Sequence, residues 1–201
     1  NIISTNFDNS GYIYTEGDLT STQTNQLTNT GDIEVFGTLN ADAVDMDLHS
    51  LIIADGGINF DATNSFTSSG DIYTQGLFDL STGSASVGGV VFANDNVEID
   101  ATLEFINTGE ISSNNQLLLS ANSILNEGNL FSALGTDITA QTSLTNSSGV
   151  IEGLSDITLT STDISNESGQ ILTSADLNII STNFDNSGYI YTEGDLASNT
   201  K

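Results

Sequence analysis

The chain of 201 residues carries one Lys or Arg against 27 Asp and Glu, giving a formal net charge of −26, and it contains no cysteine. This balance argues against nucleic acid as a partner, since basic side chains are what neutralise phosphates, and the lack of cysteine excludes disulfides and thiolate metal sites. No stretch approaches the roughly eighteen consecutive apolar residues of a membrane-spanning helix.

In chain order, the first feature is the stretch NIISTNFDNSGYIYTEGDL at residues 1–19, which returns unchanged at residues 178–196. Between the copies, a signature of the form apolar-x-Asn-x-Gly-x-aliphatic recurs at steps of 19, 20 or 21 residues. The nine steps span the 177 residues that separate residue 1 from residue 178. The glycine position is held by Gly11, Gly31, Ser50, Gly70, Gly89, Gly109, Gly128, Gly149, Gly169 and Gly188.

Two further positions of each repeat are apolar. The residue two after the glycine position is aliphatic in every repeat, from Ile13 to Ile190, and the residue eight after it is apolar from Leu19 to Leu196. In the seventh repeat the pattern slips by two residues, and we expect Ile138 to take the second position. Alternating apolar positions in short segments bounded by glycine turns predict strands.

Coils of about twenty residues bury such columns only by stacking on one another, at the ~4.8 Å spacing of neighbouring strands. The sequence therefore predicts an all-β fold, a parallel β-helix (solenoid) of about ten coils of 19–21 residues with three short strands in each coil. We expect one continuous repeat region over residues 1–201, and the repeated stretch suggests that it is an excerpt of a longer tandem array with a 177-residue super-repeat.

Asparagine recurs two or three residues before the glycine position. Stacked asparagine side chains hydrogen-bond in a ladder along a rod and satisfy backbone groups of the turns, so we predict a structural ladder. A polar binding row is the alternative interpretation, and Leu48, Ser68 and Val87 interrupt the column in either case. The column consists of Asn9, Asn29, Asn107, Asn126, Asn146, Asn166 and Asn186.

A largely aromatic column stands three residues after the glycine position. Because its neighbours on both sides point inward, this column should face solvent. Two interpretations stay open: a stripe that contacts a ligand or a lateral partner, and aromatic packing that stiffens one sheet. The column consists of Tyr14, Ile53, Tyr73, Phe92, Phe131, Leu172 and Tyr191, and Tyr12 and Tyr189 share its outward direction.

Acidic residues precede the second apolar position in several repeats. Stacked carboxylates ~5 Å apart repel one another, and calcium, which takes oxygen ligands, would relieve that repulsion. The other interpretation is an exposed acidic edge screened by salt and without any cofactor. The row consists of Asp18 in the first repeat and of Asp137, Asp156, Asp176 and Asp195 in the last ones.

The sequence offers few residues that could form a catalytic site. A Ser–His–Asp arrangement would have to use His49, the one histidine, which stands at a predicted turn. Glycoside hydrolysis needs two carboxylates at a set separation, and no carboxylate pair stands out from the repeat. We therefore expect that the chain is not an enzyme, that it has no catalytic residue, and that His49 is a solvated turn residue.

The stretches FDNSGYIYTEGDL and LTNTGDIEVFGTL resemble the haemagglutinin repeats of filamentous-haemagglutinin-like exoproteins almost letter for letter, and FTSSGDIYTQGLFDL and LTNSSGVIEGLSDI match them more loosely. The resemblance covers essentially the whole chain. It implies a right-handed β-helical shaft, secreted to the bacterial cell surface by an outer-membrane partner transporter. Such shafts belong to two-partner-secretion adhesins and to contact-dependent inhibition effectors.

These observations lead to two functional expectations. In the first, the chain is an extracellular structural shaft, and regions outside it contact the host or a neighbouring cell. In the second, it is the repeating unit of a self-associating filament, held by the aromatic column or by the open strand edges of its end coils.

Overall fold

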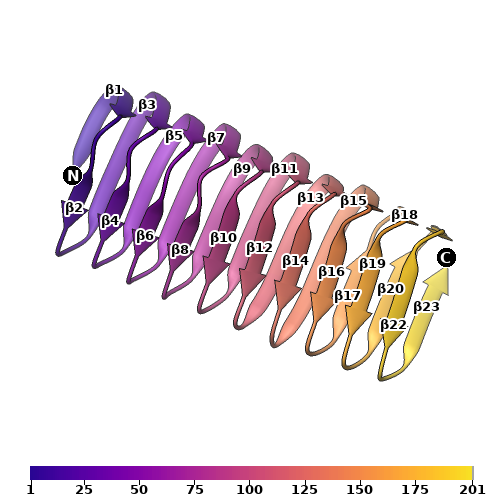
Figure 1. The fold of residues 1–201 in the computed structure, drawn as a ribbon. Coiled ribbons are helices and arrows are strands. Elements are labelled where there is room, and N and C mark those ends of the chain that lie inside the picture. The colour runs from indigo at the N-terminus through magenta and orange to yellow at the C-terminus, as the bar shows by residue number, and fades with distance from the viewer. Residues whose placement is uncertain (201) are drawn as a thin grey trace.

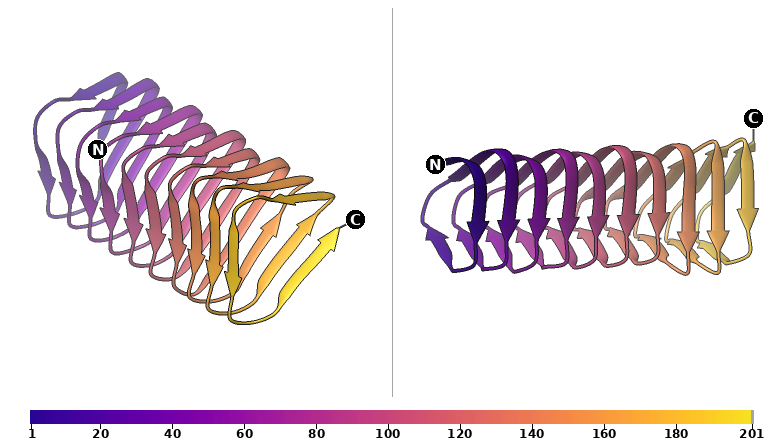
Figure 2. Two further views of the ribbon diagram at one scale, coloured as in Figure 1. Left: turned by 45° about the vertical axis from the view of Figure 1, so that its right-hand side comes forward. Right: turned by 90° about the horizontal axis from the view of Figure 1, so that it is seen from above.

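Each repeat of about twenty residues forms one coil of a solenoid in the computed structural model, which describes residues 1–200. Successive coils stack along a rod, with the two ends of the chain at its two ends (Figure 1). In Figure 2, left, the chain runs counter-clockwise as it advances toward the viewer, so the solenoid is right-handed. Within the described residues there is no helix of the length and hydropathy needed to cross a bilayer. The predicted fold class is confirmed.

The long strands form one parallel sheet that extends along the whole rod. They are β1 (Ile2–Asn9), β3 (Leu19–Asn29), β5 (Leu39–Leu48), β7 (Ile58–Ser68), β9 (Phe78–Val87), β11 (Val97–Asn107), β13 (Gln116–Asn126), β15 (Gly135–Ser147), β17 (Ile157–Thr160), β18 (Asp163–Glu167), β20 (Leu177–Ser181), β21 (Asn183–Asn186) and β23 (Leu196–Thr200).

The short strands form a second parallel sheet, which covers the opposite side of the core. They are β2 (Ile13–Thr15), β4 (Ile33–Val35), β6 (Ile52–Ala54), β8 (Ile72–Thr74), β10 (Val90–Ala93), β12 (Glu110–Ser113), β14 (Asn129–Ser132), β16 (Val150–Gly153), β19 (Gln170–Thr173) and β22 (Tyr189–Thr192).

Most coils contain two strands, so the prediction of three short strands in each coil was wrong for them. In β3 the alternation of buried and exposed residues breaks at Thr24, Asn25 and Gln26, which are exposed in succession, and the pairing with β5 shifts register there. The chain turns a corner at this point, but its hydrogen bonds to the next coil continue on both sides of it. The long strand divides only in the late coils, as β17 with β18 and β20 with β21.

A single apolar core runs the length of the rod between the two sheets. Both predicted apolar columns point into it, through Ile72 on a short strand and Phe78 on a long strand, which are fully buried. Burying a side chain of this size contributes about 1.5–3 kcal/mol. No coil buries these side chains by itself, so the coils stabilise one another through their stacking.

The seventh coil departs from the predicted register. Thr136, not Ile138, occupies the column of Leu117 and Ile157, and Ile138 takes the next inward column. The buried Thr136 is tolerated because its hydroxyl group lies 2.7 Å from that of Ser132. The expected slip of two residues was therefore wrong, and the pattern of apolar residues alone did not reveal that a paired threonine can fill an apolar column.

Candidate contact surfaces

The asparagine column lies inside the rod, where its side chains form a hydrogen-bonded ladder. The Nδ2 of Asn107 donates to Oδ1 of Asn126 at 2.8 Å, and the same bond links Asn126 to Asn146 and Asn146 to Asn166 at 2.8 Å. The ladder continues to Asn186 at 2.7 Å. Because the amides from Asn107 to Asn166 are buried, this column holds turns together and offers no surface to a ligand.

The ladder also exists at the start of the rod, between Asn9 and Asn29 at 2.8 Å. Leu48 replaces asparagine in the following coil, and the buried Nδ2 of Asn29 has no hydrogen-bond partner. The interruption by Leu48, Ser68 and Val87 thus leaves an unsatisfied amide at the end of the first ladder segment.

The acidic row is built around backbone hydrogen bonds. Oδ1 of Asp156 accepts from the backbone N–H of Asp176 at 3.1 Å, and Oδ1 of Asp176 accepts from that of Asp195 at 2.8 Å. Asp18 does the same for the N–H of Thr38 at 2.8 Å. These carboxylates satisfy amides of the next coil, and no group of three or more potential metal ligands gathers within the described part of the chain.

Asp137 lies outside this row, contrary to the expectation that it belongs with Asp156. The register pairs Asp137 with Leu118 and Thr158, two residues further along the coil than the row. In the seventh coil Gly135 stands at the position of the row, between Gln116 of the preceding coil and Asp156 of the next.

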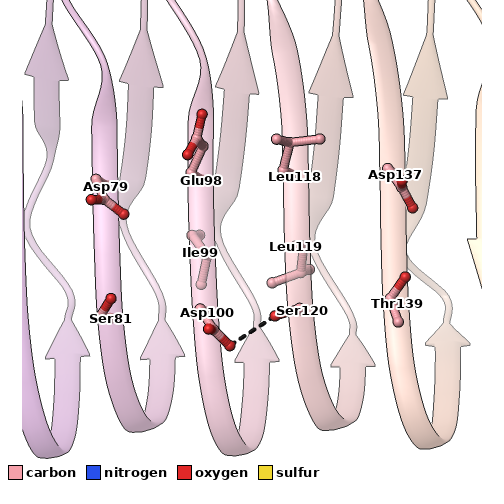
Figure 3. Close-up of a pocket in the computed structure, with 10 residues that line it drawn as sticks. All are labelled: Asp79, Ser81, Glu98, Ile99, Asp100, Leu118, Leu119, Ser120, Asp137 and Thr139. Carbon is pink, nitrogen blue, oxygen red and sulfur yellow. Dashed lines mark hydrogen bonds between the residues drawn. The ribbon is translucent and has the colours of Figure 1, made fainter.

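Asp137 instead faces an acidic hollow on the outer face of the long sheet, shown in Figure 3. The hollow has a volume of about 460 Å³, and Asp79, Glu98, Asp100 and Asp137 line it. Leu118 of β13 separates Glu98 of β11 from Asp137 of β15. Partial burial, and then the charges of Glu98 and Asp100, raise the pKa of Asp79 above its usual value. The carboxylates repel one another across the strands, so this face costs stability at neutral pH.

The single histidine has two partners that sequence reasoning missed. Nε2 of His49 lies 3.0 Å from Oδ1 of Asp47, and Nδ1 lies 2.7 Å from Oγ of Ser69. Ser69 stands twenty residues, one coil, after His49, and that spacing is the signal that would have identified it. The backbone N–H groups of Ser69 and Gly70 both donate to the carbonyl of Leu48, so they are not free to stabilise an oxyanion.

The aromatic column faces solvent on the short sheet, as its position in the repeat predicted. The register places its members in one line but inserts Glu34, Ser112 and Glu152 between them. Tyr73 and Phe92 pack together, with ring centroids 6.4 Å apart. The column is therefore a series of short apolar segments and not a continuous stripe. Its predicted members are Tyr14, Ile53, Tyr73, Phe92, Phe131, Leu172 and Tyr191.

A denser aromatic group lies beside the first segment of this column. The ring of Tyr14 contacts that of Tyr12 at a centroid distance of 6.5 Å and that of Phe36 at 5.8 Å. The hydroxyl group of Tyr12 donates to Oε2 of Glu34, and this hydrogen bond is the main reason why the pKa of Tyr12 is raised. Sequence reasoning missed Phe36, which stands five residues after its glycine position, where most repeats carry a polar or acidic residue.

Comparison with known proteins gives one match. A family model described as haemagglutinin repeat matches residues 3–45, 37–102, 88–148 and 150–200, which together cover nearly the whole chain. No curated protein and no solved structure matches the chain.

Proposed function

This chain belongs to the haemagglutinin-repeat family, and on that premise we propose that it is part of the extracellular structural shaft of a large secreted bacterial adhesin or exoprotein. The shaft projects a binding or effector tip that lies in another region of the protein. The observation that carries this proposal is the unbroken parallel pairing of both sheets, from β1 to β23 and from β2 to β22. Ten coils at ~4.8 Å form a rod of roughly 48 Å, so the length of the shaft grows in proportion to the number of coils.

Secretion by an outer-membrane partner transporter is part of this proposal. A chain without cysteine forms no disulfide that would block its passage through a narrow pore in the unfolded state. Each coil packs only on its neighbours, so folding can proceed coil by coil as the chain emerges. Detection of the repeat by antibody on intact cells tests the location, and its loss when the transporter gene is deleted tests the route.

We further propose that the shaft has no catalytic activity. The Asp47–His49–Ser69 group lies at an exposed turn whose neighbouring amides are already bonded. The acidic hollow of Figure 3 is shallow and contains no basic side chain to hold an acidic substrate. Incubation with ester and glycoside substrates should give the same rate with the chain as with buffer alone.

Electron microscopy of the isolated chain separates the shaft from its alternative. The alternative is the repeating unit of a filament, supported by the identity of residues 1–19 and 178–196, which would let a second copy continue the stack in the same register. Solitary rods of roughly 48 Å support the shaft. Bundles or fibres of indefinite length support the filament and contradict the shaft.

A further inference from the structure

We propose that the aromatic group of Tyr12, Tyr14 and Phe36, together with Glu34, binds an arginine side chain in a basic segment of a partner protein. The three aromatic side chains are 62%, 50% and 50% exposed. They form one continuous group, because Tyr14 contacts both of the other rings. Exposed aromatic groups of this kind mark interaction surfaces more often than single apolar residues do.

The outward direction of Tyr14 does not depend on its place in the first coil. Tyr73 stands in the same column with a coil on each side and is still 36% exposed. In the identical stretch at 178–196, which a complete coil precedes, Tyr189 and Tyr191 are 56% and 47% exposed.

Carboxylates surround the rings and select the charge of the ligand. Glu34 pairs with Tyr14 in the parallel register, and one of its oxygens accepts the hydrogen bond from Tyr12. The backbone bonds of Phe36 to Thr15 and of Asp55 to Val35 place Phe36 between Glu16 and Asp55 along the rod. Ring faces attract cations, and a planar guanidinium both stacks on aromatic rings and pairs with carboxylates, which an ammonium does less well.

The partner must be another kind of molecule. The chain has one Lys or Arg in total, its last residue, and a net charge of −26. A second copy therefore brings almost no cation to this group and is repelled by the charge of the first. Association through these rings consequently needs a partner that supplies arginine.

Binding of a fluorescein-labelled peptide with six arginines tests the proposal by fluorescence anisotropy, in about 0.3 M salt to screen non-specific attraction. A lysine peptide of the same length is the second probe. We expect the arginine peptide to bind several-fold more tightly. Tyr12→Ser/Tyr14→Ser/Phe36→Ser, which keeps the net charge, removes three exposed rings and should weaken its binding by more than about tenfold.

Tyr189→Ser/Tyr191→Ser is the matched control, since it removes two identical exposed tyrosines without touching Phe36, and its binding should change less than twofold. Phe36→Leu keeps the apolar contact with Tyr14 while it removes a ring, and should weaken binding about threefold. Equal affinity for both peptides, or the same loss in the triple variant and in the control, overturns the proposal.

Discussion

Replacing Asn126 by alanine tests how much the asparagine ladder stabilises the rod. The amide is fully buried. Its Oδ1 accepts from Asn107 at 2.8 Å, and its Nδ2 donates to Asn146 at 2.8 Å and to the carbonyl groups of Gly128 at 3.1 Å and Val150 at 3.3 Å. One side chain thus joins three successive coils.

The cost follows from the groups that Asn126→Ala leaves without partners. Oδ1 of Asn146 loses its ladder donor, and Nδ2 of Asn107 keeps only the carbonyl of Asn129 at 3.2 Å. A buried polar group left unsatisfied costs about 1–3 kcal/mol. With two groups affected and one of them partly compensated, we expect a loss of about 2–4 kcal/mol in the free energy of unfolding.

Urea unfolding followed by circular dichroism measures this loss, and hydrogen exchange locates it. Since coils interact mainly with their neighbours, protection should fall in β13, β14 and β16 and stay unchanged in β4 and β6. Asn25→Ala is the control, because Asn25 makes the same kind of inter-coil amide bond, to Asn6 at 2.7 Å, but on the exposed surface. That variant should change stability by less than about 0.5 kcal/mol. Equal losses in both variants would refute the idea that burial gives the ladder its strength.

Four further predictions concern other parts of the rod. Gly109→Ala should destabilise by about 1–3 kcal/mol in urea unfolding, since its Cβ would lie 2.1 Å from the carbonyl oxygen of Gly89, whereas Gly17→Ala, with open space around it, should be neutral. Asp79→Asn should raise Tm near pH 7 but not near pH 3. The pKa of Asp79 is raised in the folded chain, so the stability that its protonated carboxyl group contributes is complete below the unfolded pKa of 3.8 and is lost as pH rises through the folded pKa. An equal gain in Tm at both pH values would exclude titration of Asp79 as the cause. Millimolar calcium at constant ionic strength should leave Tm unchanged, since Asp176 and its row are bonded to backbone amides; a calcium-dependent rise would restore the metal interpretation. Trypsin should leave even the denatured chain uncut, because its only basic target is the last residue, and internal fragments would contradict this.

The sequence revealed the repeat, the inward columns and the outward direction of Tyr14 and its equivalents because a coil of fixed length imposes the same environment on every twentieth residue. Register was harder to predict. Thr136 fills an apolar column, so the apolar pattern alone placed Ile138 there instead. That assignment moved Asp137 two residues from its true position, into the place that Gly135 holds.

Contacts between coils could be predicted only where a column repeats. The ladder through Asn107 and Asn126 follows from such a column. Phe36 and Ser69 occupy positions that differ in neighbouring coils, so their contacts with Tyr14 and His49 became visible only in the folded chain.

The sequence by itself determined a parallel β-solenoid of about ten coils, since the apolar columns of one coil can be buried only by the next. Tertiary structure decided what the periodic pattern leaves open. In most coils the long strand turns a corner without being divided. Aspartates such as Asp156 accept hydrogen bonds from backbone amides of the next coil, and Tyr12, Tyr14 and Phe36 lie in contact. The physical reason is that a repeat fixes the direction of each side chain, while contacts depend on the residue that stands beside it in the neighbouring coil.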